Sequence, residues 1–318
     1  MKKSKNYVMK DTLQFKDTLL SLSEDIEQAI AHIYSHSRSL EKFSDHKLIE
    51  SLDVNDEEMK QILSQYSSEG YLRKRLREQL TWRVKEYNYF TTYKYRLFLK
   101  ALILCLNNNN ILCASAIARI ALELGAQLYD LTERITMLYK QLSEKVRTSS
   151  YSYANDLLPI YKKIIQSLES VLRQTRFDFR KWSLMKALDK EEELSETIMR
   201  EFDKGEVLLT KGIKAKNILG SLKRMSKNER FKKIWLFYSF LSEITHPNLG
   251  SYLPLIETVD MEKKAFYITC DLSDDVIRRN NELISIITII LKVVDQCGEL
   301  IVNCGDRLYA LIKDTYKG

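Results

Sequence analysis

Glycine and proline are scarce in this chain, with 9 and 3 copies in 318 residues. Turn-rich β architectures need both residues at many positions, so their scarcity argues against such folds and favours helices. The sequence also lacks a G-x-x-x-x-G-K-[ST] loop, a G-x-G-x-x-G turn, a Cys-x-x-Cys pair and an H-E-x-x-H helix. The common nucleotide-binding, dinucleotide-binding and zinc-peptidase motifs are therefore missing, and the sequence implies no cofactor.

The overall composition is that of an ordinary globular protein. Charged residues make up 29% of the chain and hydrophobic residues 45%, which is not typical of disordered chains. The formal net charge of +7 is a modest excess of positive charge. Such an excess permits binding to nucleic acid without requiring it.

Cysteine usage and hydropathy indicate a cytoplasmic protein. The 5 cysteines are an odd number without close pairs in the sequence, which argues against a disulfide framework and a zinc site. The basic start of the chain is not followed by the apolar region of a signal peptide. The most apolar run, from Leu283 to Val294, contains Lys292 and is too short to span a bilayer, so we expect no membrane partner.

The pattern of helices and breaks predicts an all-α, multi-helix bundle. We expect a helical N-terminal module at residues 1–88 and a larger bundle at residues 89–318. The four asparagines from Asn107 to Asn110 interrupt two long helical stretches and suit a left-handed helix end. Residues 252–270 are the least helical part, and their composition allows one short β-hairpin.

The first candidate site is a polar stripe on one predicted helix. The segment from Lys227 to Thr245 is apolar over most of its circumference, which predicts a buried helix. Glu243 and His246 share one side of it with two serines, and Pro247 ends the helix. A carboxylate on a buried helix needs a partner, because desolvating a lone charge is costly.

That partner is expected on the helix that starts at Ile111. Arg119 and Glu123 are four residues apart in an otherwise apolar run and can form an ion pair. If the two helices share one bundle, Arg119 can bridge Glu123 and Glu243, with His246 at the helix end. Such a cluster could hold an anion or transfer protons, since histidine titrates near neutral pH. Alternatively it fixes the packing of the helices and has no chemical role.

Residues 71–100 form a second candidate site. They contain 9 lysines or arginines against 2 glutamates, interleaved with 8 aromatic residues. Cations bind phosphates and flat rings stack on unpaired bases, so this composition predicts contact with single-stranded RNA or DNA. The expected binding residues are Arg73, Lys74, Arg75, Arg77, Trp82 and Arg83. The alternative is core packing, because Trp82, Tyr89 and Tyr93 share one helical face.

Two further histidines, His32 and His36, are four residues apart on a predicted helix. This spacing is compatible with a metal site, but the sequence shows no cysteine or carboxylate motif to complete one. We interpret the two histidines as a surface pair and expect no metal.

One combination of motifs resembles a known superfamily. An Arg-x-x-x-Glu helix (Arg119 to Glu123) precedes Tyr-x-x-Leu-Ser-Glu-x-x-His-Pro (Tyr238 to Pro247), which is similar to the HEPN helical bundles. The resemblance implies a cytoplasmic, often dimeric protein of bacterial toxin, antiviral defence or mobile-element systems. It also implies that His246 is the histidine of a metal-independent ribonuclease. The arginine that the nuclease motif carries shortly before its histidine is missing here, so Arg119 would have to supply the cation.

Two functions follow from these patterns, besides a third possibility, a bundle that senses a small ligand or a nucleotide. The first is a HEPN-like effector or accessory protein that associates with RNA or DNA, with His246 in acid–base chemistry, Arg119 stabilising phosphate, and Glu123 and Glu243 orienting them. The second is a non-catalytic scaffold for protein–protein interaction or oligomerisation, in which these four residues are structural. In either case we expect a homodimer or a companion protein.

Overall fold

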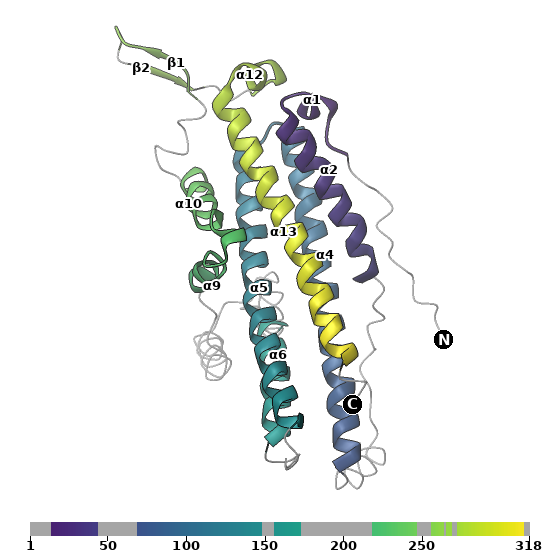
Figure 1. The fold of residues 1–318 in the computed structure, drawn as a ribbon. Coiled ribbons are helices and arrows are strands. Elements are labelled where there is room, and N and C mark those ends of the chain that lie inside the picture. Colours follow the sequence, from purple (N-terminus) through teal and green to yellow (C-terminus); the bar gives the residue numbers. More distant parts are fainter. Residues whose placement is uncertain are drawn as a thin grey trace, which may run out of the picture. The chain divides into compact units, whose positions relative to one another are not determined.

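The computed structural model describes residues 14–43, 69–147, 156–172, 218–246, 256–263, 265–268 and 272–314 (Figure 1). Helices dominate this part of the chain, which confirms the predicted all-α fold class. The elements in chain order are α1 (Asp17–Leu20), α2 (Glu24–Ser39), the 3-10 helix η1 (Leu40–Phe43), α4 (Glu69–Asn107), α5 (Ile111–Arg147), α6 (Leu158–Leu172), α9 (Ile218–Met225), the 3-10 helix η3 (Glu229–Phe231), α10 (Ile234–Thr245), β1 (Ile256–Asp260), β2 (Ala265–Ile268), α12 (Asp274–Arg279) and α13 (Asn281–Asp314).

The predicted hairpin is present. Strands β1 and β2 pair antiparallel, from Asp260 opposite Ala265 at the turn to Ile256 opposite Ile268 at the open end. The register shifts between Ile256 and Thr258, which marks a bulge near the open end. The first strand begins at Ile256, so residues 252–255 of the predicted hairpin lie outside the described residues.

The chain divides into two compact units, and the long helices α4, α5 and α13 contribute residues to both. One unit includes Asn88–Thr132 and Ser221–Arg307 together with the described residues before 44. The other includes the described residues within Ile49–Tyr87, Glu133–Gly220 and Leu308–Gly318. The boundary predicted between residues 88 and 89 falls inside α4, which continues through it as one helix.

In the first unit, α13 packs closely on α4 and on the α2–η1 segment. The Tyr95 side chain on α4 is fully buried, and its hydroxyl donates a hydrogen bond of 3.0 Å to the Val294 carbonyl oxygen. Burial raises the pKa of Tyr95 well above its usual value. A Cβ atom at Gly298 would lie 2.5 Å from the Tyr95 hydroxyl, and one at Gly305 would lie 2.6 Å from the Phe43 ring. Both glycines in α13 therefore allow close contact between neighbouring elements.

The contact between α2 and α13 is also polar, which the sequence did not predict. Ser23 caps α2 by accepting a hydrogen bond from the Ile26 amide. His36 Nε2 lies 3.0 Å from one carboxylate oxygen of Asp295, and His32 Nδ1 lies 3.4 Å from the other. His32 is exposed, as expected for a surface pair, but both histidines also share a carboxylate that comes from α13.

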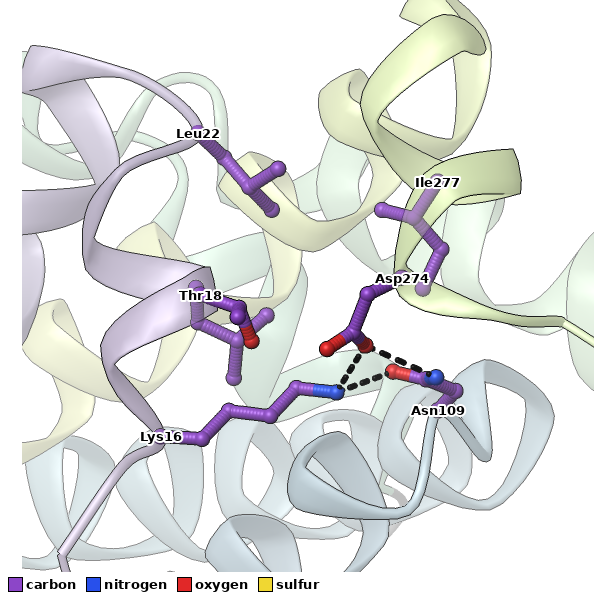
Figure 2. A pocket seen from close by; sticks show the side chains of 7 residues that line it. Lys16, Thr18, Leu22, Asn109, Asp274 and Ile277 are labelled. Carbon is purple, nitrogen blue, oxygen red and sulfur yellow. Dashed lines mark hydrogen bonds and ion pairs between the residues drawn. The ribbon is translucent and has the colours of Figure 1, made fainter.

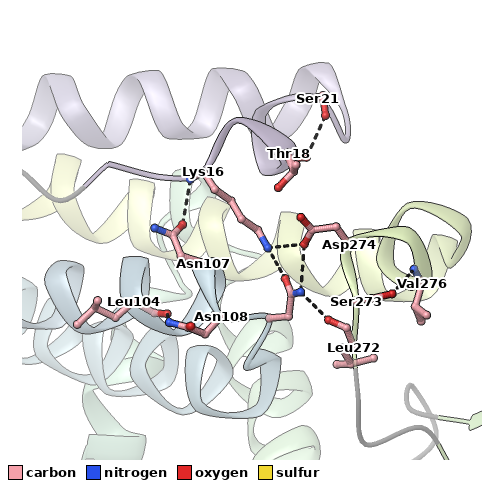
Figure 3. A network of polar contacts seen from close by, with 11 residues as sticks. Lys16, Thr18, Ser21, Leu104, Asn107, Asn108, Leu272, Ser273, Asp274 and Val276 are labelled. Carbon is pink, nitrogen blue, oxygen red and sulfur yellow. Dashed lines mark hydrogen bonds and ion pairs between the residues drawn. The ribbon is translucent and has the colours of Figure 1, made fainter.

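The asparagine turn between α4 and α5 joins three segments of the first unit (Figure 3). Asn109 adopts the predicted left-handed conformation, with φ of 58°. Its side chain donates to the Leu272 carbonyl and to Asp274, and it accepts from Lys16, which also pairs with Asp274. The hydrogen bond from Lys16, followed by that from Asn109, lowers the pKa of Asp274.

A small open cavity, with about 160 Å³ of empty space that includes open solvent, lies beside this junction (Figure 2). Its polar wall consists mainly of Lys16, Asn109 and Asp274, which bond to one another. Leu19, Leu22 and Ile277 supply the apolar wall. The charged side chains at its rim are already paired with one another. We therefore interpret the cavity as a gap left where these segments meet.

The second unit has a core of its own. Tyr161, Ile164 and Leu168 form the buried stripe of α6, with a spacing of three and four residues that is typical of an amphipathic helix. Within the same unit, Lys145 on α5 lies 3.3 Å from Asp156, just before α6. This short ion pair joins the two ends of the connection between α5 and α6.

Helix α5 is the one described helix with the length and composition needed to cross a membrane. Half of its most apolar window is buried inside the protein, which is typical of a core helix. The most apolar run of the sequence, Leu283 to Val294, belongs to α13. That helix continues to Asp314 and also contains Asp295.

Candidate functional site

Arg119 on α5 is held by both its own helix and α10. Its guanidinium donates hydrogen bonds of 3.3 Å to the Thr245 hydroxyl and of 3.3 Å to the Tyr238 hydroxyl. It also lies 3.5 Å from the Glu123 carboxylate, four residues further along α5. The expected contact between these two helices at Arg119 is therefore present.

Tyr238 closes this set of contacts, which we call the Arg119 network (Arg119, Glu123, Tyr238 and Thr245). Its hydroxyl donates a hydrogen bond of 3.3 Å to Glu123, and the Arg119 guanidinium lies 5.2 Å from the centre of its ring. The Thr245 hydroxyl donates to the Leu241 carbonyl, 2.8 Å away, as well as accepting from Arg119. Each member thus bonds to another member, so the positive charge of Arg119 already has a counter-charge and two oxygen acceptors.

Glu243 and His246 lie elsewhere on the helix. Both side chains are exposed, and the partners of Arg119 on α10 are Tyr238 and Thr245 instead. His246 is the C-cap residue of α10, with extended backbone angles, and its amide donates to the Ser242 carbonyl. The structure therefore brings together Arg119 and Glu123 of the four predicted residues.

The prediction that α10 is buried on nearly all sides is wrong. Its buried residues are Ile234, Leu241 and Ile244, whereas Leu236 is 70% exposed. The helix also starts at Ile234, after the separate 3-10 turn that Asn228 caps, and not near Lys227. Apolar residues occur around most of the circumference of α10, but only one face of the helix is packed. The sequence pattern therefore predicted more burial than the structure has.

The sequence did contain a signal for the two residues that were missed. Tyr238 and Thr245 are seven residues apart, so they lie on one face of α10. That face borders the buried side formed by Leu241, whereas Glu243 points away from it. A tyrosine and a threonine at the edge of a buried face can both accept from an arginine and donate onward, which carboxylates cannot do.

The aromatic face of α4 is the second candidate site. Its stacked tyrosines lie at the surface and not in the core, where the alternative interpretation placed them. Tyr93 is 47% exposed, and its ring stacks on that of Tyr89 with 6.4 Å between centres and 12° between planes. The residues of α4 that are buried in the first unit lie on the other side of the helix: Asn88, Thr91, Thr92, Tyr95, Leu99, Leu102, Ile103 and Leu106. The stacked tyrosines are therefore outside the core.

Apolar and basic side chains surround the stacked pair. Phe90, Leu97 and Leu104 on α4 are exposed, at spacings of seven residues that place them along one stripe. Lys94 and Lys100 are exposed as well, and no acidic residue occurs between 87 and 107. We call the surface formed by Tyr89, Phe90, Tyr93, Leu97 and Leu104, with its two lysines, the α4 face.

The nucleic-acid-binding residues predicted from the sequence lie earlier on α4. Arg73, Lys74, Arg75 and Arg77 belong to this helix, and their side chains are outside the described part. The guanidinium of Arg83 lies 4.4 Å from the Trp82 ring centre and 2.8 Å from the Glu86 carboxylate. Arg83 thus already has an anionic partner.

No set of three or more histidine, cysteine or acidic side chains within the described ranges is arranged to hold a metal ion. Comparison of the chain with models of protein families, with curated proteins and with solved structures gives no match.

Proposed function

We propose that this protein binds single-stranded RNA or DNA through the α4 face. The observation that carries the proposal is the stacked pair of Tyr89 and Tyr93, of which Tyr93 is 47% exposed. An exposed ring is a platform for an unpaired base, and such stacking is worth about 1–3 kcal/mol per base. Because every base has a flat face, recognition by this pair would depend little on sequence.

The charges of the α4 face fit the same ligand. Lys94 and Lys100 are exposed on a stretch without acidic residues, so a phosphate backbone beside the rings would meet cations and no anions. Each phosphate neutralised in this way releases counterions, which makes binding weaker at high salt. The net charge of +7 favours the approach of a polyanion from any direction.

We assign the Arg119 network a structural role in this proposal. Arg119 directs its hydrogen bonds to Thr245 and Tyr238 and pairs its charge with Glu123. A phosphate would have to displace these contacts before Arg119 could stabilise charge in a cleavage reaction. The ribonuclease activity implied by the HEPN resemblance would therefore need a rearrangement of α10, and binding without cleavage is the simpler function.

The biological setting in the proposal rests on the motif from Tyr238 to Pro247 and its resemblance to HEPN bundles. A cytoplasmic effector or accessory protein of a bacterial defence, toxin–antitoxin or mobile-element system is the setting that this resemblance implies. A homodimer or a companion protein would be usual there.

Binding of a labelled, unstructured RNA and of a single-stranded DNA to the full-length protein tests the function. Tyr93→Ala is expected to weaken binding by about 5- to 150-fold, the range that the loss of one stacked base implies. Tyr93→Phe keeps the ring and should bind like the wild type. Leu236→Ala, on the exposed side of α10, is the matched control for loss of an exposed side chain.

The same reactions also report cleavage, with His246→Ala and Arg119→Ala beside the wild type. Intact RNA in all three reactions agrees with a binding protein. Cleavage by the wild type that His246→Ala abolishes, with folding preserved, would replace the proposal with the ribonuclease function.

A protein-binding function is the second candidate, and the exposed apolar stripe of α4 favours it. Phe90, Leu97 and Leu104 repeat every seven residues, which is the spacing by which one helix packs along another. If the stripe is an oligomer interface, Leu97→Asp should shift the protein to a smaller species in sedimentation. A monomer that is unchanged by Leu97→Asp and binds RNA would reject this candidate.

A further inference from the structure

Helix α10 carries more apolar surface than it buries. Leu236 is 70% exposed, so its side chain protrudes from the protein. Three other large apolar residues of this 12-residue helix are half-buried: Trp235, Phe237 and Phe240. Exposed apolar groups that lie together on a surface usually mark a contact with a partner protein or with a membrane.

Basic side chains lie at the start of this helix. Helix α9 and the first turn of α10 are neighbours (Figure 1), and Lys223 Nζ lies 5.5 Å from the centre of the Trp235 ring. Lys233 is exposed and precedes Leu236 by three residues, and Lys227 is exposed in the connection between the helices. We call the surface formed by Lys223, Lys227, Lys233, Trp235 and Leu236 the α9–α10 surface.

The positive charge of this surface is not balanced. The stretch from residue 221 to residue 245 contains six lysines or arginines, and three of them form ion pairs. The pairs are Arg224 with Asp130, Arg230 with Glu299 and Lys232 with Glu229. The other three cations, Lys223, Lys227 and Lys233, form no ion pair with any residue that the structure describes. An anionic partner would therefore meet unpaired lysines beside apolar side chains.

We propose that the α9–α10 surface docks on an anionic lipid bilayer, with Leu236 inserted among the headgroups and the three unpaired lysines beside the lipid phosphates. Helices that lie on a bilayer combine exposed leucine and aromatic side chains with lysines in this way. Tryptophan favours the boundary between the headgroups and the acyl chains, where Trp235 would lie. The proposal goes beyond nucleic-acid binding by the α4 face and does not depend on it.

The apolar side chains distinguish a bilayer from other anionic partners. Leu236 has neither a charge for a phosphate nor a flat ring for a base. The Trp235 ring already contacts Lys223 and stacks on Tyr238, with 6.2 Å between ring centres, so it is a poor platform for a base. A partner helix is usually received in a groove, whereas Leu236 protrudes. A bilayer accepts a protruding side chain because lipids can move around it.

The docking is expected to be shallow and reversible. Ser239 and Glu243 follow Leu236 by about one and two turns on the same side of α10, so the apolar surface ends within the helix. The attraction between lysines and anionic lipids is also screened by salt. The expectation of no membrane partner was based on the length of apolar runs and concerned spanning segments. A helix that lies on the bilayer surface needs no such length.

The test is co-sedimentation of the full-length protein with vesicles of phosphatidylcholine, with or without the anionic lipid phosphatidylglycerol. We expect binding to the anionic vesicles alone, and loss of that binding at high salt. Leu236→Ala should weaken it by about 5- to 50-fold, because the carbons that enter the bilayer are removed. Met137→Ala, at a position on α5 that is 55% exposed, is the matched control and should bind like the wild type.

The lysines are tested by a second pair of variants. The double variant Lys227→Gln/Lys233→Gln should weaken vesicle binding at low salt by about 25-fold, or about fivefold for each lysine. Lys85→Gln/Lys140→Gln removes the same charge from exposed positions outside the α9–α10 surface and should retain binding. Equal binding to vesicles without phosphatidylglycerol, no binding to either kind, or wild-type binding by the Leu236 and Lys227/Lys233 variants would each overturn the proposal.

Discussion

The Arg119 network and the α4 face differ in what they leave for a ligand. In the network, one cation, one carboxylate and two hydroxyls satisfy one another within 3.5 Å. On the α4 face, Tyr93 stacks on Tyr89 through one side of its ring and is still 47% exposed. The residue types most often used in catalysis are thus engaged in holding two helices together. The aromatic residues that are usually core residues lie on the surface.

The largest effect is expected when the two sides of α4 are compared through two tyrosines. Tyr95→Ala empties a fully buried position against Val294, and should destabilise the fold by about 3–5 kcal/mol. Tyr93→Ala removes an exposed ring and should change stability by less than about 0.5 kcal/mol. Urea unfolding of both variants measures the contrast. Equal destabilisation by the two would show that the α4 face is packed.

The Arg119 network should respond to mutation in stability. Arg119→Ala leaves the Glu123 carboxylate and the Tyr238 hydroxyl without their shared partner, in a site that is about a quarter exposed. Partial exposure reduces the cost of a fully buried pair, so we expect a loss of about 1–2 kcal/mol. Tyr238→Phe should cost about 1 kcal/mol, because the ring over Arg119 remains. If thermal unfolding is unchanged in both variants, the structural role is contradicted.

The cations of the α4 face can be separated from its rings by salt. Replacing both Lys94 and Lys100 by Gln should weaken RNA binding most at low salt. It should also reduce the dependence of log K on log salt by about 1.4, or about 0.7 for each phosphate that is no longer neutralised. Tyr93→Ala should leave that slope unchanged while lowering affinity at every salt concentration. A slope that stays the same in the lysine variant would place the phosphate contacts elsewhere.

The smallest effect is expected at the junction around Asp274, which belongs to neither the Arg119 network nor the α4 face. Its pKa is lowered by hydrogen bonds from Lys16 and Asn109, so the folded protein favours the charged carboxylate. That contribution is present above the unfolded pKa of about 3.9 and is lost as the pH falls through the lower folded value. Asp274→Asn should therefore flatten the acid side of the stability curve. Measuring urea unfolding from about pH 2 to about pH 5, which covers the interval below that unfolded value, tests this.

Much of the fold could be predicted from short stretches of the sequence. The shortage of glycine and proline predicted helices, and the asparagine run predicted a left-handed turn, which Asn109 adopts. The hairpin also followed from composition. Each of these depends on neighbours in the chain, because propensity and turn chemistry act over a few residues.

The sites were harder to predict because they depend on which faces meet. The spacing of Arg119 and Glu123 predicted their pairing, since that contact lies within one helix. Two other contacts, of Tyr238 with Arg119 and of His36 with Asp295, join elements that only tertiary packing brings together. For α10 and α4, the apolar residues cover more of the helix than one packed face needs. Periodicity therefore could not identify the exposed side.

The most direct test of the central claim is photo-crosslinking of the full-length protein to a single-stranded RNA that contains 4-thiouridine, with the crosslinked peptide identified by mass spectrometry. Binding through the α4 face predicts crosslinks at Tyr89 or Tyr93 that are lost when Tyr93 is replaced by alanine. Crosslinks that map instead to the region of His246, or that survive Tyr93→Ala unchanged, would contradict it.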